Sequence, residues 1–173
     1  MSEYKVSITG YENKVFYGYL KEEWRNATGE LHRENGPAII VANPRTGDVH
    51  LQEYYWHGWL HRENGPARIE RYSEQLIEEW FITGKEHRDD APAYLSTDPA
   101  TGRIQAERWY TNGEPHKIGA PAMLVHKMDG SGYSTASYYI NGVRYFETLE
   151  AMIEEEYEPD ESRLVPWLKT PQP

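Results

Sequence analysis

Verbatim self-repetition is the feature of this chain that most restricts its fold. The eight residues LHRENGPA occur at 31–38 and again, unchanged, at 60–67. Two looser copies follow, EHRDDAPA at 86–93 and PHKIGAPA at 115–122. Glycines precede these histidines by three residues and recur at steps of 29, 26, 29 and 29 residues, at Gly29, Gly58, Gly84, Gly113 and Gly142. Such a period is typical of stacked supersecondary units, each of which buries its apolar face only against its neighbours.

Each repeat reads as two strands joined by two turns. Short aromatic runs end at four of the glycines, EYYWHG, EWFITG, RWYTNG and SYYING, and their composition favours strands. The Asn112-Gly113 and Asn141-Gly142 steps suit a tight hairpin turn, because glycine adopts positive φ angles without a steric penalty. A proline follows eight residues after each of the first four glycines, and second strands are expected to begin at Ala38, Ala67, Ala93 and Ala122.

This pattern predicts an all-β fold in a single domain. Residues 1–146 are expected to form an elongated, twisted antiparallel meander of about five β-hairpins, with cap strands in 4–20 and repeats from about 22 to 146. Residues 147–158 are acidic, and the spacing of their apolar side chains predicts a C-terminal capping α-helix. Residues 159–173 are proline-rich and are expected to be an extended tail, with Leu164, Val165, Trp167 and Leu168 docking part of it.

Charge and composition exclude several classes of function. The 173 residues hold 18 Lys and Arg against 28 Asp and Glu, a formal charge of -10, which disfavours direct binding of nucleic acid or of anionic membranes. A basic or nucleic-acid-binding protein partner is electrostatically easier. Cysteine is absent, so disulfides and thiolate chemistry are excluded. No apolar run resembles a signal peptide or a membrane span, and we expect a cytoplasmic protein, in the host cytoplasm if a phage encodes it.

A row of histidines recurs at one position of the repeat: His32, His61, His87 and His116. Equivalent residues of successive hairpins lie two strands apart, about 9.5 Å, whereas ligands of one zinc ion each lie about 2 Å from it. The row therefore predicts neither a metal site nor a cofactor. We expect the histidines to bond the backbone of the corner, and each following arginine to pair with the adjacent acid.

The cations beside these histidines leave a second hypothesis open. Arg62, Arg88 and Lys117 stand near aromatic residues and are candidates for holding a nucleotide or cyclic nucleotide. Paired arginines would gain little from an anion, and Lys117 is the exception because it lacks an adjacent acid. An enzyme using a pair such as His61 and Glu63 is a weaker reading, since nothing singles out one pair.

Two further features are candidates for partner binding. Alternation along the aromatic strands places one aromatic row on each face of the sheet, and the row three residues before each glycine is a candidate stripe: Tyr55, Phe81, Tyr110 and Tyr139. Residues 147–161 contain no basic residue and form either a solvated face or a mimic of nucleic acid. The candidate residues there are Glu150, Glu154, Glu155 and Glu158.

The repeat resembles degenerate MORN-type repeats, in which an aromatic strand is followed by NGxxHREdGPA and a second strand. The resemblance covers about residues 22–142, and Ile118 replaces the acid in the fourth copy. Similar proteins occur in bacteria and bacteriophages, and some are antitoxin-like. The resemblance implies a hairpin scaffold for binding and no catalytic residue set.

The leading hypothesis is therefore a non-enzymatic protein-binding module. It would be a phage or bacterial inhibitor, anti-defence, anti-CRISPR-like or antitoxin-like, that blocks a host protein. The alternative is a small-ligand sponge that uses the cations and aromatic rows. A homodimer through an incompletely capped sheet edge is also open.

Overall fold

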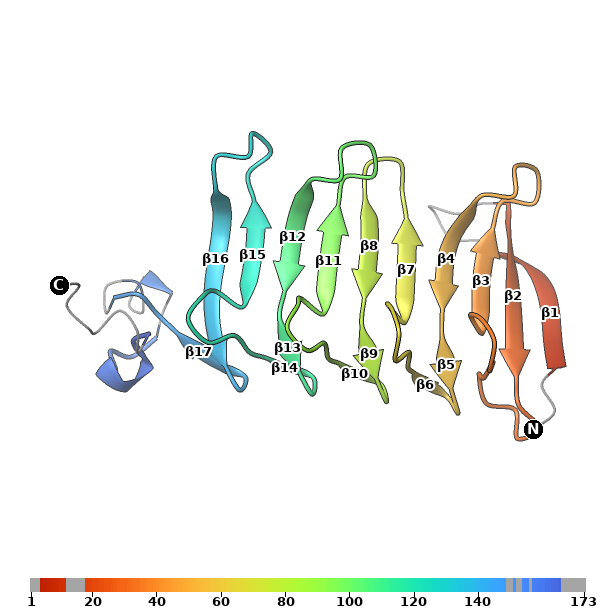
Figure 1. Cartoon of the computed structure of the whole chain (residues 1–173), viewed down its shortest axis with the longest axis horizontal. Helices are drawn as coiled ribbons and strands as arrows, with labels where there is room; N and C mark the ends of the chain where they lie inside the picture. Colours follow the sequence, from red (N-terminus) through yellow and green to blue (C-terminus); the bar gives the residue numbers. More distant parts are fainter. Residues whose placement is uncertain (1–3, 12–17, 149–150, 152–153, 156, 166–173) are drawn as a thin grey trace.

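The computed structural model describes residues 4–11, 18–148, 151, 154–155 and 157–165, and for residues 5–11 it describes the backbone alone. These residues form an elongated antiparallel sheet in a single layer, with the chain running from one end to the other (Figure 1). Neighbours along the sheet follow the order β1-β2-β3-β4-β7-β8-β11-β12-β15-β16, and β17 pairs with the far part of β16. The strands of this sheet are β1 (Tyr4–Tyr11), β2 (Tyr19–Arg25), β3 (Ile39–Ala42), β4 (Val49–Glu53), β7 (Arg68–Arg71), β8 (Leu76–Glu79), β11 (Tyr94–Thr97), β12 (Ile104–Arg108), β15 (Met123–His126), β16 (Tyr133–Ile140) and β17 (Val143–Tyr145). The predicted all-β fold is confirmed.

Small hairpins continue the long strands along one edge of the sheet, the lower edge in Figure 1, which we call the hairpin edge. They are β5 (Tyr55–Trp56) with β6 (Trp59–Leu60), β9 (Phe81–Ile82) with β10 (Lys85–Glu86), and β13 (Tyr110–Thr111) with β14 (Glu114–Pro115). One residue separates each small hairpin from the long strand before it, and its N–H donates to the buried alanine that precedes the next long strand, as in Tyr54 N to Ala67 O at 2.7 Å. The chain changes pairing partner at this residue.

The hairpin turns have the backbone that the glycine pattern predicts. Both central residues of each turn have positive φ, for example 55° at Asn112 and 87° at Gly113, as a type I′ turn requires. The same position holds His57 at 46° and Thr83 at 51°. These residues adopt positive φ less readily than asparagine. The turn is thus imposed by the repeat even where the local residue does not favour it.

The second strands begin one residue later than predicted, at Ile39, Arg68, Tyr94 and Met123. The preceding alanines are completely buried, and three of their N–H groups bond across to the neighbouring strand, such as Ala67 N to Glu79 O at 2.8 Å. Before each alanine lies a loop that we call a corner loop, at residues 32–37, 61–66, 87–92 and 116–121. The links between repeats lie at the opposite edge, the linker edge.

The buried apolar core is small because the sheet is a single layer. Ile39, Val41 and Leu51 form a cluster of buried residues, against which Tyr19, Leu31 and Tyr55 pack. Further along the sheet the buried hydrophobic residues are mostly isolated alanines, with Ile69 and Leu124. Stability therefore depends strongly on polar contacts between neighbouring strands and repeats.

The predicted capping helix at 147–158 is not seen. Residues 149, 150, 152, 153 and 156 lie outside the described ones, and the others show one helical hydrogen bond, Glu155 N to Ala151 O at 3.3 Å. The regular element described here is a short 3-10 helix, η1 (Glu161–Arg163), which Asp160 caps. Ala151 and Glu154 have helical backbone, and no α-helix of greater length is described in this stretch.

The start of the tail packs against the residue that follows β17. Phe146 and Val165 are buried, and Val165 N donates to Phe146 O at 2.9 Å in a parallel bridge. Trp167 and Leu168 lie outside the described residues. At the other end β1 lies within the predicted cap region of 4–20, whereas the second strand, Tyr19–Arg25, extends beyond it. None of the described helices is long and apolar enough to cross a membrane.

Candidate functional site

The four histidines join each repeat to the next one. Each Nδ1 accepts the N–H of the first central residue of the following hairpin turn: His57 N to His32 at 3.2 Å, Thr83 N to His61 at 3.1 Å, Asn112 N to His87 at 3.3 Å and Asn141 N to His116 at 3.1 Å. A neutral ring that accepts at Nδ1 carries its proton on Nε2. The histidines thus hold backbone, as expected, although that backbone belongs to the next repeat's turn and not to the corner.

A second inter-repeat hydrogen bond lies beside the first. The N–H of each turn glycine donates to a carbonyl of the preceding repeat, as in Gly58 N to Leu31 O and Gly84 N to Leu60 O, both at 2.8 Å. Among the described residues no three or more histidines and carboxylates lie close enough together to hold a metal ion. The two repeated hydrogen bonds make the histidine row a ladder that joins successive repeats.

The corner arginines do not pair with the acids beside them. Their Nη1 atoms donate to a proline carbonyl four residues later, Arg33 to Pro37 and Arg62 to Pro66 at 3.1 Å and Arg88 to Pro92 at 3.2 Å. Their guanidinium carbons lie 4.1, 3.9 and 3.8 Å from the ring centroids of Trp24, Tyr54 and Trp80. The predicted pairing is wrong because the ring and the carbonyl together hold the guanidinium in the corner.

Lys117 takes the same place in the fourth copy. Its Nζ lies 3.7 Å from the Trp109 ring centroid. Desolvation lowers the pKa of Lys117, and the nearby charge of Glu107 opposes that change. A cation over an aromatic ring is thus common to all four corner loops.

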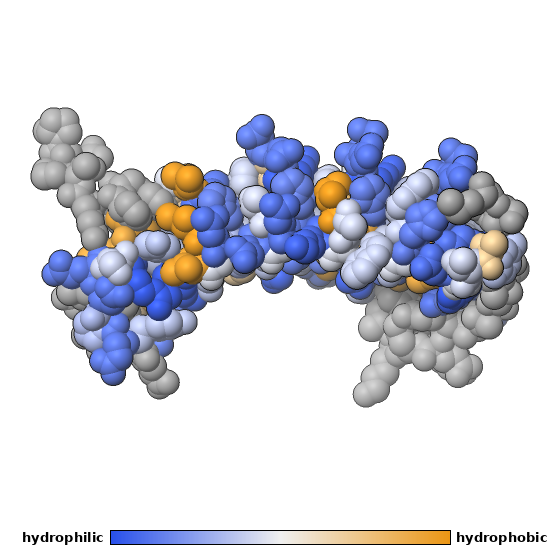
Figure 2. All heavy atoms as spheres, turned by 90° about the horizontal axis from the view of Figure 1, so that it is seen from below, coloured by the Kyte–Doolittle hydropathy of each residue, from blue (hydrophilic) through white to orange (hydrophobic). Residues whose placement is uncertain are grey.

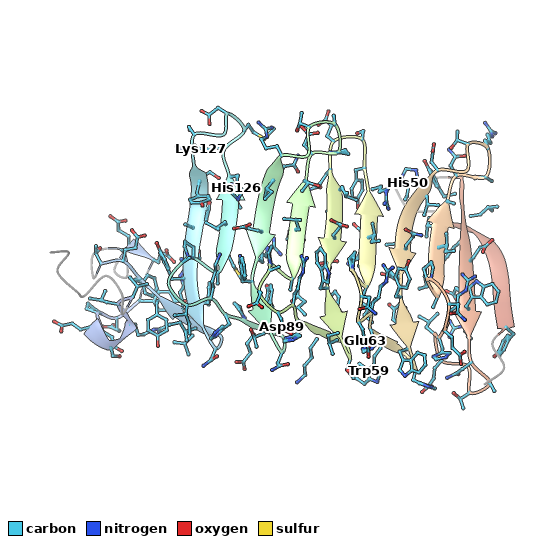
Figure 3. The ribbon with its side chains drawn as sticks, in the orientation of Figure 1. His50, Trp59, Glu63, Asp89, His126 and Lys127 are labelled. Carbon is cyan, nitrogen blue, oxygen red and sulfur yellow. The ribbon has the colours of Figure 1, made fainter. Side chains whose placement is uncertain are left out.

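Grooves separate consecutive corner loops. Groove 1 encloses about 670 Å³ between Arg33, the Tyr54 to Trp56 segment, and Arg62 with Glu63. Groove 2, of about 540 Å³, lies between Arg62 with Glu63 and Arg88 with Asp89, and is floored by Trp80 and Ile82. Groove 3, of about 300 Å³, lies between Arg88 and Lys117 over Trp109 and Tyr110. Figure 3 shows Glu63 and Asp89 following one another along the lower part of the sheet.

Two exposed tryptophans lie at the hairpin edge next to groove 1. Trp56 is 46% exposed and Trp59 is 59% exposed, and the two residues face each other across the β5–β6 hairpin. Trp59 is labelled at the lower edge in Figure 3 and packs against Gly84, where an added Cβ would lie 2.5 Å from the ring. Figure 2 views this edge, which is mostly hydrophilic with a few separate hydrophobic spots.

The sequence contains a signal for Trp59 that the prediction missed. The other copies carry Glu30, Lys85, Glu114 and Val143 at this position, immediately after the turn glycine. A large aromatic residue at an exposed site where its equivalents are mostly charged is an exception within the repeat. Trp56 is likewise the large exception among its equivalents, which include Ile82, Thr111 and Ile140.

The predicted stripe of Tyr55, Phe81, Tyr110 and Tyr139 is half-buried. Tyr55 packs on the core cluster, and its hydroxyl donates to Glu53 Oε2 at 3.4 Å. Burial, with the neighbouring charge of Glu53, raises the pKa of Tyr55 to about 12. The carbonyls of Tyr55, Phe81 and Tyr139 accept N–H groups from the preceding corner loops. The row supports the grooves, and its role in partner binding stays a prediction.

The acidic candidates lie apart from the grooves. Glu154, Glu155 and Glu158 are exposed, whereas Glu150 lies outside the described residues. Glu155 Oε1 accepts from Arg144 Nη2 at 2.6 Å. That pair ties the acidic segment to β17, and mimicry of nucleic acid stays a prediction.

The sheet register assembles a carboxylate cluster that the sequence does not reveal. Arg68 lies 3.3 Å from a carboxylate oxygen of Glu53 and 3.3 Å from one of Glu79, and it also contacts Glu70. Burial raises the pKa of both Glu53 and Glu79, although the charge of Arg68 opposes the shift. These residues come from three neighbouring strands, so one cation holds together three carboxylates.

Comparison of the chain with models of protein families, with curated proteins and with solved structures found no match. The resemblance to MORN-type repeats therefore stays a prediction, and we infer function from the site itself.

Proposed function

We propose that this chain is a non-enzymatic protein-binding module that engages its partner along the hairpin edge. The observation that carries the proposal is the coincidence of three adjoining grooves with two exposed tryptophans on the same edge. Tryptophan, tyrosine and arginine are the residues that most often dominate binding energy at protein interfaces. The net charge of -10 favours a basic partner.

Inhibition of that partner is the mode of action that we propose. A row of similar grooves can bind an extended segment of another protein. Binding of this kind would prevent that segment from contacting its other partners. The phage or bacterial setting of such an inhibitor rests on the resemblance of the repeats alone.

The other repeats show which residues the same positions of the hairpin accept. Trp59→Lys and Trp56→Thr install the residues that other copies carry at the same positions, Lys85 and Thr111. The expected result is loss of partner capture from a lysate of the native cell, by at least ten-fold, with unchanged folding. Tyr133→Thr is the control, because Tyr133 is 50% exposed but lies in β16 away from the grooves. Equal capture by the double variant and the control would refute the proposed surface.

Binding of a small anion is the second candidate function. It is favoured by the finding that Arg62 and Arg88 stack on rings and carry no carboxylate partner among the described ion pairs. Lys117 extends the row. Thermal shifts against a panel of nucleotides and cyclic nucleotides test it, since a ligand at 100 times its Kd stabilises by about 2.7 kcal/mol. Absence of any shift at millimolar ligand would exclude this function.

A further inference from the structure

The grooves recur at the period of the sheet, and this period fits one kind of peptide. Equivalent points of successive repeats lie two strands apart, about 9.5 Å. A polyproline II helix has three residues per turn and a rise of about 3.1 Å per residue, so it returns to the same orientation every 9.3 Å or so. A segment of this kind laid across the strands presents an equivalent face to each groove in turn.

The unequal repeat lengths arise away from the hairpin edge. The shorter 26-residue step arises at the link between β7 and β8, where Tyr72 N donates to Gln75 O at 2.8 Å. That link lies at the linker edge, the upper edge in Figure 1. Adjacent grooves also share their walls: grooves 1 and 2 share Arg62 and Glu63, and grooves 2 and 3 share Arg88 and Asp89. The three grooves therefore lie side by side along the hairpin edge, and we call this row of grooves the track.

The chemistry of the track also fits a proline-rich segment. Tyr54, Trp80 and Trp109 line successive grooves, and a cation of the corner loop stacks on each ring. Proline rings pack on aromatic surfaces in known recognition of this conformation, and here they would contact the part of each ring that lines the groove. A polyproline II backbone has no internal hydrogen bonds, so its carbonyls are free acceptors. Arg62 and Arg88, in the walls between the grooves, each donate one side-chain hydrogen bond to a proline carbonyl, and their other N–H groups could donate to a bound peptide.

The charge of the track favours a basic residue next to the prolines of the bound segment. The outer rim of the track carries exposed carboxylates at Glu63, Asp89 and Asp90, and the Asp89 side chain is 91% exposed. The whole chain has a charge of -10. Lysine or arginine at every third position of a bound segment would face this rim, whereas acidic residues there would be repelled.

We propose that the partner of this module is a basic, proline-rich segment in the polyproline II conformation, bound across the three grooves. The proposal rests on the proposed function and names its partner class. Each Pro-Pro-Arg triplet occupies one groove, with the two prolines against the aromatic floor and the arginine at the rim.

Synthetic peptides test this directly with the full chain. Binding of capped peptides made of one to five Pro-Pro-Arg triplets is measured by calorimetry and by the fluorescence of the tryptophans. Affinity is expected to rise with each triplet up to three and then to level off, because three grooves are then filled. A block peptide, in which six prolines are followed by three arginines, has the same composition and charge as the three-triplet peptide. We expect it to bind at least ten-fold more weakly.

Protein variants locate the contact. Glu63→Gln and Asp89→Asn are each expected to weaken binding of the three-triplet peptide about three-fold, as for exposed ion pairs. Glu74→Gln, the same charge change at the linker edge, is the control and should leave affinity unchanged. Equal binding of the block peptide, tighter binding of a peptide of three Pro-Pro-Glu triplets, or no binding at millimolar peptide would overturn the proposal.

The partner class and the binding surface can be refuted separately. If the peptides do not bind but capture of a protein still depends on Trp56 and Trp59, only the partner class is wrong. If capture is indifferent to the tryptophans, the proposed surface itself is wrong.

Discussion

Arg68 is the side chain whose removal we expect to cost the sheet most among the charged residues. It contacts three carboxylates whose side chains are each less than 15% exposed, those of Glu53, Glu70 and Glu79. Arg68→Met keeps the length and apolar stem of the side chain but leaves three partly buried negative charges without their cation. Breaking a fully buried pair costs about 3–5 kcal/mol.

The magnitude here is smaller, because the Arg68 side chain is 37% exposed and solvent screens the lost interaction. The carboxylates also relieve part of the cost by binding protons. We expect a loss of about 2 kcal/mol in the free energy of unfolding near pH 8. For a chain of this size that corresponds to a fall of about 4–8 °C in Tm.

The pH dependence gives the sharper test. Burial raises the pKa of Glu53 and Glu79 above their usual 4.5, so each contributes stability below that pH and loses it as the pH rises through the folded-state pKa. Removing the Arg68 charge should raise the pKa of both carboxyl groups further, because that charge lowers them. The difference between variant and wild type should therefore be small at pH 4 and grow toward pH 8.

Urea unfolding followed by circular dichroism between pH 4 and pH 8 measures this difference. Arg71→Met is the matched control, since Arg71 is exposed on the same strand. Adding Glu79→Gln to Arg68→Met should restore part of the lost stability at pH 8. A variant as stable as wild type at pH 8, or one whose deficit is largest at pH 4, would refute the role assigned to the cluster.

Three further predictions concern the repeat ladder, each read out by chemical or thermal unfolding. Thr83→Asn should stabilise the chain by about 0.5–1 kcal/mol, because Thr83 has a φ of 51° and asparagine tolerates this region better; a loss of stability would contradict it. Gly84→Ala should destabilise by more than about 2 kcal/mol, since its Cβ would lie 2.5 Å from the Trp59 ring at a φ of 75°; rescue by Trp59→Lys would confirm the cause, and absence of rescue would point to the backbone instead. His61→Ala should cost about 1 kcal/mol through the lost acceptor for Thr83 N–H, and an unchanged Tm would count against the ladder.

Local sequence signals predicted the parts of the fold that depend on local chemistry. The Asn-Gly steps marked tight turns because few residues accept positive φ, and the Pro-Ala pairs marked strand starts to within one residue. The predicted helix at 147–158 is not seen as a continuous element among the described residues, of which Ala151 and Glu154 have helical backbone. The spacing of apolar residues there suggested a helix, but this spacing does not show that Val165 docks on Phe146.

The site was predictable only in its composition. The sequence indicated that Arg62, Arg88 and Lys117 lie near aromatic residues. In the structure each of these cations stacks on an aromatic ring. It could not show that the arginines bond proline carbonyls in preference to acids, because that choice depends on the shape of the corner loop. The Arg68 cluster depends on register across three strands, which no local pattern contains.

Site-specific photo-crosslinking tests the central claim, that the hairpin edge is the partner-binding surface. A benzophenone amino acid replaces Trp59 in one variant and Tyr133 in another, and each is irradiated in a lysate of the native cell. The account predicts one dominant crosslinked protein from position 59 that is absent from position 133. The same protein crosslinked from 133 and not from 59 would contradict it.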